Sequence, residues 1–138
     1  MAGKKLFFFF WKRPSTLGVK DGKLAPCPSS PNCVSSQAPS SDKQHWIEPI
    51  SFRSTPETAL ANLKSVVQGM KGAEIISETG DYLYAEFTSA LMGYVDDVEF
   101  YLDRNGGVIH VRSASRLGKS DLGVNRKRVE EIRSQFSK

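Results

Sequence analysis

The most regular hydrophobic pattern in the chain lies in residues 54–72, "STPETALANLKSVVQGMKG". Apolar side chains recur there every three or four positions, at Leu60, Leu63, Val67 and Met70. This spacing places them on one face of an amphipathic helix that packs on a core. Thr55 is a candidate N-cap, the proline after it fits the first helical position, and glycines at 69 and 72 mark the end.

After this helix the pattern changes to alternating apolar and polar positions. The alternation predicts strands at residues 73–78, 82–89, 95–103 and 108–115. The "TGD" and "RNGG" stretches between them are typical of tight hairpins, and connections this short make neighbouring strands antiparallel. One face of these strands is expected to pack against the helices, through Leu83, Ala85, Phe87, Val98, Phe100, Leu102, Ile109 and Val111.

A second helix is predicted near the end of the chain, in "GVNRKRVEEIRSQF". Val129, Ile132 and Phe136 form a narrow apolar stripe along it. Asp121 or Asn125 is expected to cap its first turn.

Residues 1–44 are rich in Pro, Ser, Gly and Lys and show neither period, so we expect an extended N-terminal arm there. A short strand is predicted at residues 46–52. Because Pro49 cannot donate a hydrogen bond to a neighbouring strand, we expect this strand at the edge of the sheet. Residues 45–138 then form a single α+β domain. Its antiparallel sheet has about five strands and two helices on one face, in the order β-α-β-β-β-β-α.

The other face of the strands is polar. It presents Tyr82, Tyr84, Glu86, Asp97, Glu99, Tyr101, His110 and Arg112. An open face of this kind can bind a protein partner. The candidate protein-binding residues on it are Tyr82, Tyr84, Glu99, Tyr101 and Arg112. The alternative is a solvated face held by cross-strand pairs such as Glu99 with Arg112.

Asp96 breaks the alternation, because it falls in phase with Val98 and therefore points toward the core. A buried carboxylate needs a partner, so we predict an internal ion pair with Arg116, Arg126 or Arg128.

The segment from the last strand into the last helix, "SASRLGKSDLGVNRKR", is a candidate anion site. Backbone N–H groups of a glycine-containing loop at a helix N-terminus attract anions. The candidate residues are Asp96, Ser113, Ser115, Arg116, Lys119, Arg126 and Arg128. The alternative is a purely structural network of caps and ion pairs.

The net charge of +4 comes largely from the N-terminal segment, which favours an acidic partner or an anionic membrane surface. No nucleic-acid signature accompanies it, so nucleic acid is not expected as a partner. The apolar run near the N-terminus is too short for a secretory signal or a spanning helix. We expect the protein in the cytoplasm or plastid stroma, with contacts to a membrane surface or protein complex through Leu6, Phe7, Phe8, Phe9, Phe10 and Trp11. The alternative is a tail whose aromatic side chains pack on the domain itself or on a partner.

Cys27 and Cys33 are the only cysteines, in "CPSSPNC". They could form a disulfide if their Cα atoms lie within about 7 Å, and in a reducing compartment that bond would be conditional. A loop with two free thiols stays open as the alternative. Neither the spacing of a zinc site nor a motif for a Cys-His nucleophile with His45 or His110 is present. The sequence therefore predicts no catalytic residue, no metal and no cofactor.

Three stretches, "CPSSPNCVSSQ", "YVDDVEFYLD" and "RSASRLGKSDLGVNRKRVEEIR", resemble the family known as domain of unknown function 1499. The first, with the residues before it, looks like the cyanobacterial and plastid branch. The resemblance implies no catalytic residue, and by association it implies a place near the photosynthetic apparatus, including the thylakoid surface.

Three functional hypotheses follow. The first is a non-enzymatic interaction module, an auxiliary or assembly factor on a larger complex at the photosynthetic membrane. The second is a binder of a small anion or lipid head group between the sheet and the last helix. The third, a hydrolytic enzyme, has no nucleophile motif behind it. The oligomeric state does not follow from the sequence.

Overall fold

The computed structural model describes residues 12–117 and 123–136. Its first helix, α2 (Pro56–Gln68), confirms the helical pattern. The side chain of Thr55 accepts a hydrogen bond from the backbone N–H of Thr58 at 3.2 Å, and Gly69 follows the last turn. The apolar face is buried as predicted, with Met70 partly buried against the core.

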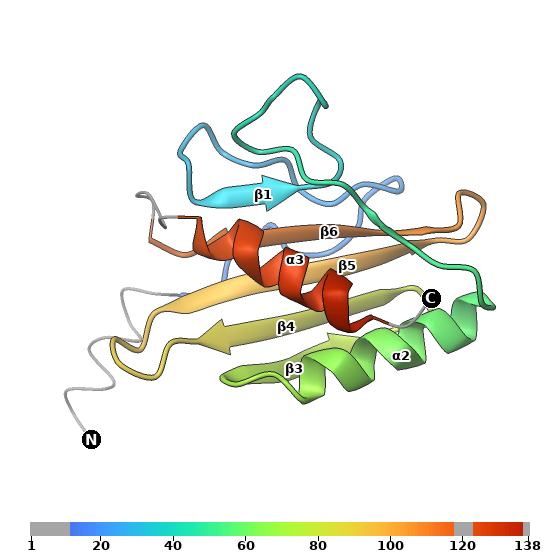
Figure 1. Cartoon of the computed structure of the whole chain (residues 1–138). Helices are drawn as coiled ribbons and strands as arrows, with labels where there is room; N and C mark the ends of the chain where they lie inside the picture. The colour runs from blue at the N-terminus through green and yellow to red at the C-terminus, as the bar shows by residue number, and fades with distance from the viewer. Residues whose placement is uncertain (1–11, 118–122, 137–138) are drawn as a thin grey trace.

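The four predicted strands are also present. They are β3 (Ala73–Glu78), β4 (Tyr82–Thr88), β5 (Val95–Asp103) and β6 (Val108–Ser115). Each pairs antiparallel with the next along the chain. They are the main part of a six-stranded sheet in which β2 pairs with β6 beside the path β1-β6-β5-β4-β3. Figure 1 shows the strands of that path in this order.

The two short strands differ from the sequence prediction. β1 (Cys33–Ser35) lies in the stretch predicted as an extended arm, and it pairs antiparallel with β6 at Arg112 to Ala114. A three-residue strand is too short to show a period of two, so the pattern contains no signal for it. β2 (Ile50–Ser51) is shorter than the strand predicted at residues 46–52 and pairs with the other end of β6.

The last helix, α3 (Val124–Gln135), is present, but Asn125 is not its cap. Gly123 takes the N-cap position with φ of 80°, and among the described residues no side chain makes a capping hydrogen bond there. Asn125 is instead inside the helix and fully buried. The other candidate, Asp121, lies outside the described residues.

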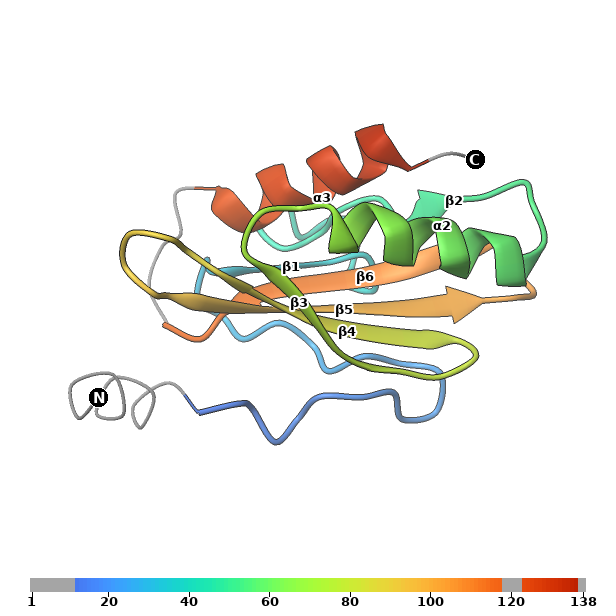
Figure 2. The same cartoon turned by 90° about the horizontal axis from the view of Figure 1, so that it is seen from below.

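Both helices cover the same face of the sheet, as Figure 2 shows. The core between them takes all of the predicted inward-facing residues of β4, β5 and β6. The predicted stripe of α3 packs there too, with Val129 and Ile132 fully buried.

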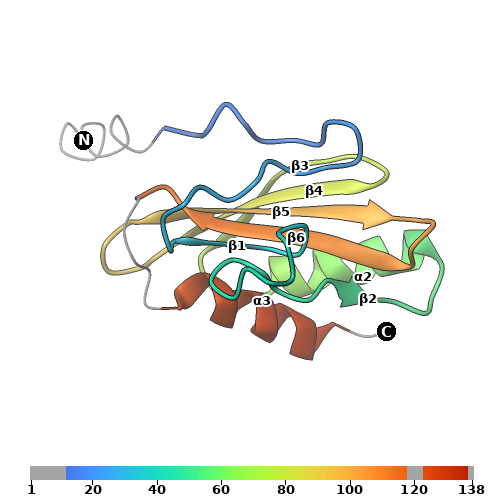
Figure 3. The same cartoon turned by 90° about the horizontal axis from the view of Figure 1, so that it is seen from above.

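The opposite face of the sheet is not open, which corrects the sequence analysis. The N-terminal arm runs across it, on the side away from the helices (Figures 2 and 3). The polar side chains beneath are consequently out of solvent: Tyr84, Asp97, Glu99 and Arg112 are all buried. The sheet therefore lies between a layer of helices and a layer of extended chain.

A disulfide between Cys27 and Cys33 ties this arm to β1, with 5.7 Å between the two Cα atoms. Cys33 is fully buried at the start of the strand. The bond therefore joins the covering layer covalently to the sheet edge.

We expect replacement of both cysteines, Cys27→Ser with Cys33→Ala, to lower the free energy of unfolding by about 2 kcal/mol. The physical reason is that the bond closes a loop across a sequence separation of 6, and losing it frees the unfolded chain by about this amount. Chemical denaturation of the two proteins under oxidising conditions measures the difference.

Reductant provides the matched control. It should lower the stability of the natural protein to nearly that of the double variant and leave the double variant unchanged. Equal stability of the oxidised and fully reduced natural protein would contradict a stabilising role for the bond.

Candidate functional site

The interior of the arm-covered face is an ion-paired cluster at one end of β4, β5 and β6. Arg116, just after β6, makes two hydrogen bonds to Asp97, at 3.0 and 2.9 Å, and one to Glu86 at 2.7 Å. The hydroxyl oxygen of Tyr84 lies 2.6 Å from Asp97 Oδ1 and 2.8 Å from Glu86 Oε2, so its one proton is donated to either carboxylate. The arm contributes Arg13, whose Nε donates to Glu86 at 2.6 Å.

These contacts set the protonation states of the cluster. Burial acts to raise the pKa of Glu86, but hydrogen bonds from Arg13 and Tyr84 and the charge of Arg116 outweigh it, so this pKa lies below its ordinary value. Burial and the hydrogen bonds to Asp97 and Glu86 raise the pKa of Tyr84 far above its usual range. Glu86 therefore stays ionised and the tyrosine stays a donor.

A second group lies farther along the same face, around Glu99. One carboxylate oxygen accepts hydrogen bonds from the hydroxyl of Tyr82 at 2.5 Å and from the backbone N–H of Gly18 in the arm at 2.7 Å. Its other oxygen, Oε1, is 4.0 Å from Nη1 of Arg112, opposite it on β6. The predicted cross-strand pair is thus present, although it is long. Burial raises the pKa of Glu99.

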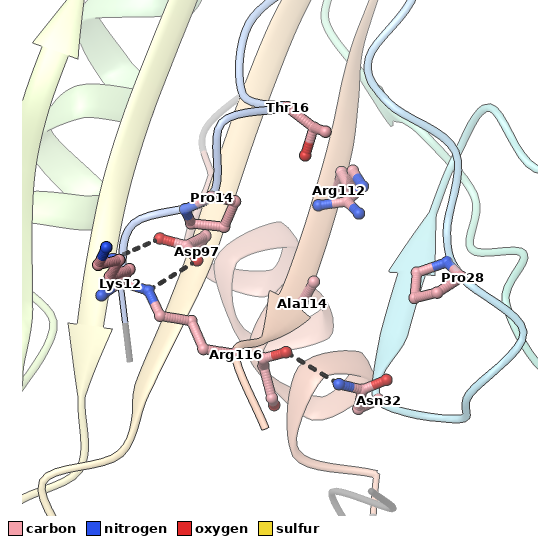
Figure 4. A pocket seen from close by; sticks show the side chains of 10 residues that line it. Lys12, Pro14, Thr16, Pro28, Asn32, Asp97, Arg112, Ala114 and Arg116 are labelled. Carbon is pink, nitrogen blue, oxygen red and sulfur yellow. Dashed lines mark hydrogen bonds and ion pairs between the residues drawn. The ribbon is translucent and has the colours of Figure 1, made fainter. Parts of the chain in front are cut away.

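A pocket of about 160 Å³ opens between the arm and this face. Figure 4 shows Asp97, Arg112, Ala114 and Arg116 on the strand side, with parts of the arm opposite them. The arm residues that line it lie in two stretches, 12–16 and 28–32. Covering chain and sheet thus meet around a space in which four of the ten lining residues are charged.

On the helix face a separate cluster surrounds Asp96. The predicted ion pair is present and its partner is Arg128, with Nη2 2.8 Å from Oδ2. The same guanidinium lies over the ring of Phe87, 4.8 Å from its centroid, and donates to the side chains of Ser113 and Asn125. This network anchors α3 to the sheet.

Asn125 completes that network from inside α3. Its amide nitrogen donates to the backbone carbonyl of Asn32 at 3.2 Å and to the hydroxyl of Ser115 at 2.9 Å. Its carbonyl oxygen accepts from the hydroxyl of Ser113 at 2.6 Å. The helix, β6 and the arm are therefore joined at one fully buried side chain.

The structure brings only four of the seven predicted anion-binding residues together. Arg116 lies on the arm side of the sheet, because it is in phase with Arg112 and not with Ser113. Arg126 donates to the backbone carbonyls at 43 and 44 instead. Lys119 lies outside the described residues. The remaining four, Asp96, Ser113, Ser115 and Arg128, form the helix-face network.

The predicted protein-binding residues of the sheet lie beneath the arm. Tyr82, Tyr84, Glu99 and Arg112 make the contacts given above, and Tyr101 stacks on His110 with 6.4 Å between ring centroids. Leu6 to Trp11 lie outside the described residues. The candidate binding residues chosen from the sequence did not include Arg13, Glu86 or Asp97. Three acids and only one arginine on that face were nevertheless a signal that further cations pair with them.

Large exposed apolar side chains gather at one end of the molecule, which we call the apolar end: Leu91, Met92, Tyr94, Leu117 and Val124. They lie in the β4–β5 connection, after β6 and at the start of α3. These three places, together with the start of the described arm, are at the same end of the sheet (Figures 1 and 2). Leu91 is 91% exposed and Met92 54%.

Neither cysteine nor histidine forms a nucleophilic or metal site in the part of the chain that the structure describes. Both cysteines are in the disulfide, and no group of three or more His, Cys, Asp or Glu side chains could hold a metal ion there. His45 is buried between two acceptors, with Nδ1 2.7 Å from Asp42 Oδ2 and Nε2 2.9 Å from the backbone carbonyl of Ser30. It joins the arm to the loop before β2.

The fold defines a class of small α+β domain whose sheet is covered by helices on one face and by its own N-terminal arm on the other. The chain belongs to the family described as "Protein of unknown function (DUF1499)", whose model matches residues 23–136. This confirms the resemblance found in the sequence. A comparison with the curated proteins and one with the solved structures found no significant match.

The two histidines are expected to titrate on opposite sides of pH 6.5. The hydrogen bond to the Ser30 carbonyl and the one to Asp42 raise the pKa of His45, while burial lowers the pKa of His110. NMR titration of the imidazole signals measures both, and the chain has only these two. A His45 pKa at or below 6.5 would contradict the doubly donating geometry.

The sign for stability follows from the His45 shift. Because its folded pKa is raised, its contribution is fully present below pH 6.5 and is lost as the pH rises through that folded pKa. The variant His45→Gln should remove this loss, and His110→Gln should retain it. Denaturation curves across this range give the comparison.

Proposed function

We propose that the protein is a non-enzymatic interaction module that docks on a larger assembly at an anionic membrane surface. The observation that carries this proposal is the apolar end. All five large exposed hydrophobic side chains of the described residues lie at this end, and exposed apolar groups of this kind can mark interaction sites.

The sequence of residues 1–11 supports the same proposal. The described arm starts at the apolar end, at residue 12, and the sequence before it contains Lys4, Lys5 and the run from Leu6 to Trp11. Aromatic side chains next to lysine and arginine suit the interface of an anionic bilayer, where apolar burial and charge attraction add.

The interior clusters support a binding role over catalysis. The charged groups of the Asp96 and Asp97 clusters are engaged by one another in the described structure, which suits a rigid scaffold. No helix among the described residues is long and apolar enough to cross a membrane. Contact from one surface therefore fits the described domain.

The assembly is proposed to be part of the photosynthetic membrane. The support is the N-terminal stretch that resembles cyanobacterial and plastid members of the family. The role would be that of an auxiliary or assembly factor, which holds a complex without turning over a substrate.

The test is co-sedimentation of the full chain with vesicles containing an anionic lipid and with membranes from its own cells. The double variant Leu91→Ser with Met92→Ser should bind both about tenfold more weakly, because the two side chains lose their apolar burial. A second variant lacking residues 2–11 should lose binding to anionic vesicles and retain the fold.

The matched control is Asn105→Ser, an exposed change in the β5–β6 turn at the opposite end of the sheet. Its binding should equal that of the natural protein. Membrane binding that is unchanged in the Leu91 and Met92 double variant would overturn the proposal. Loss with native membranes alone would assign the contact to a protein in those membranes.

A further inference from the structure

Arg112 is a buried cation whose hydrogen-bonding capacity the protein leaves largely unused. Its side chain is 9% exposed and carries five N–H donors. Within the described residues it makes a single hydrogen bond, from Nη2 to the backbone carbonyl of Pro26 at 3.3 Å. Its Nε has no partner there, and the 4.0 Å from Nη1 to Glu99 is beyond hydrogen-bond distance.

Arg116 on the same face shows how the fold satisfies such a group. It holds Asp97 with two hydrogen bonds and Glu86 with a third. Buried guanidinium groups are normally paired in this way, since an unpaired buried charge is strongly unfavourable. Arg112 is therefore the exception on this face, and Glu99 Oε1 beside it is likewise without a hydrogen-bond partner among the described residues.

The same side chain lines the pocket of about 160 Å³ beneath the arm. Figure 4 shows its guanidinium between Thr16 and Pro28, two arm residues that line the pocket from the other side. A water molecule takes about 30 Å³ in the liquid, so the space suits an ion of a few heavy atoms with some water.

The charges that line the pocket favour an anion. Among the described lining residues Lys12, Arg112 and Arg116 are cationic and Asp97 is the one carboxylate, while Glu86 and Glu99 contact Arg116 and Arg112 from outside the lining. Arg116 already neutralises that carboxylate through its two hydrogen bonds. A guanidinium fork matches two oxygens of one oxyanion better than any neutral ligand.

We propose that this pocket binds a small oxyanion of the phosphate or carboxylate class, held by the unused donors of Arg112. The site differs from the one expected between the sheet and the last helix, since it lies on the opposite face. The arm forms its outer wall, so the bound ion would lie between covering chain and sheet. The proposal does not rest on the membrane-docking role.

The test is titration of the full chain at constant ionic strength with inorganic phosphate and with acetate, against chloride. The readout is the Nε–H signal of Arg112 in proton–nitrogen NMR spectra. We expect a saturable shift with phosphate or acetate and none with chloride. The tighter of the two anions identifies the class of ligand.

Three variants locate the site. Arg112→Lys keeps the charge and loses the fork, so its affinity should fall about tenfold or more. Ala114→Leu leaves every charge in place and fills the pocket from β6, so it should abolish binding. Arg53→Gln, an exposed change outside the pocket, should bind like the natural protein and controls for net charge.

Ala114→Leu also keeps the test decisive if Arg112→Lys does not fold. Its affinity can be followed by the Arg112 signal and by calorimetry. An Arg112 signal that responds equally to all three anions, or an affinity that Ala114→Leu leaves unchanged, would overturn the proposal.

Discussion

The structure depends on charge balance in the layer between the N-terminal arm and the sheet. Three carboxylates and three guanidinium groups meet there, from Glu86, Asp97, Glu99, Arg13, Arg112 and Arg116. Charges removed from water cost much free energy unless they are paired and hydrogen-bonded. The arm supplies part of that pairing through the Arg13 side chain and the Gly18 N–H. The arm therefore covers the sheet and pairs its buried charges at the same time.

This requirement explains why an arm with little regular secondary structure can still hold a defined position. Its contacts are hydrogen bonds at separate points, and a disulfide and the β1 pairing fix its later half. His45 adds a further link at the Ser30 carbonyl. Each contact is modest, but together they restrict the covering chain to one path over the charged side chains.

The sequence predicts the helix-covered face of the sheet well. Burial of that face against the helices requires apolar residues at every second strand position, and this alternation can be seen in the sequence. Every inward position named on β4, β5 and β6 is buried, and Asp96 has the ion pair that its phase implied. Alternation also contains the information that Arg116 faces the other way, since it is in phase with Arg112. The predicted anion site grouped Arg116 with Ser113 and Ser115, although alternate residues of a strand point to opposite faces of the sheet.

The arm side could not be predicted in the same way. Residues 12–32 contact the sheet mainly through backbone groups and single side chains, and such contacts leave no period. The indirect signal was compositional: the exposed-looking face carried Glu86, Asp97 and Glu99 but only Arg112 to balance them. An excess of carboxylates on a strand face indicates that cations must come from elsewhere in the chain, or that the face stays in water. The pattern alone does not decide between the two.

The same stretch of arm links the two surfaces to which we assign roles. Residues 12–16 line the pocket at Arg112, and the described arm begins with them beside the apolar end. Arg13 in this stretch is bound to Glu86. A partner that binds residues 1–11 and an anion that bridges the arm and the sheet would therefore both act on residues 12–16. The effect of each ligand on the binding affinity of the other must be reciprocal. An anion that holds the arm against β6 also fixes the point from which the N-terminal segment extends.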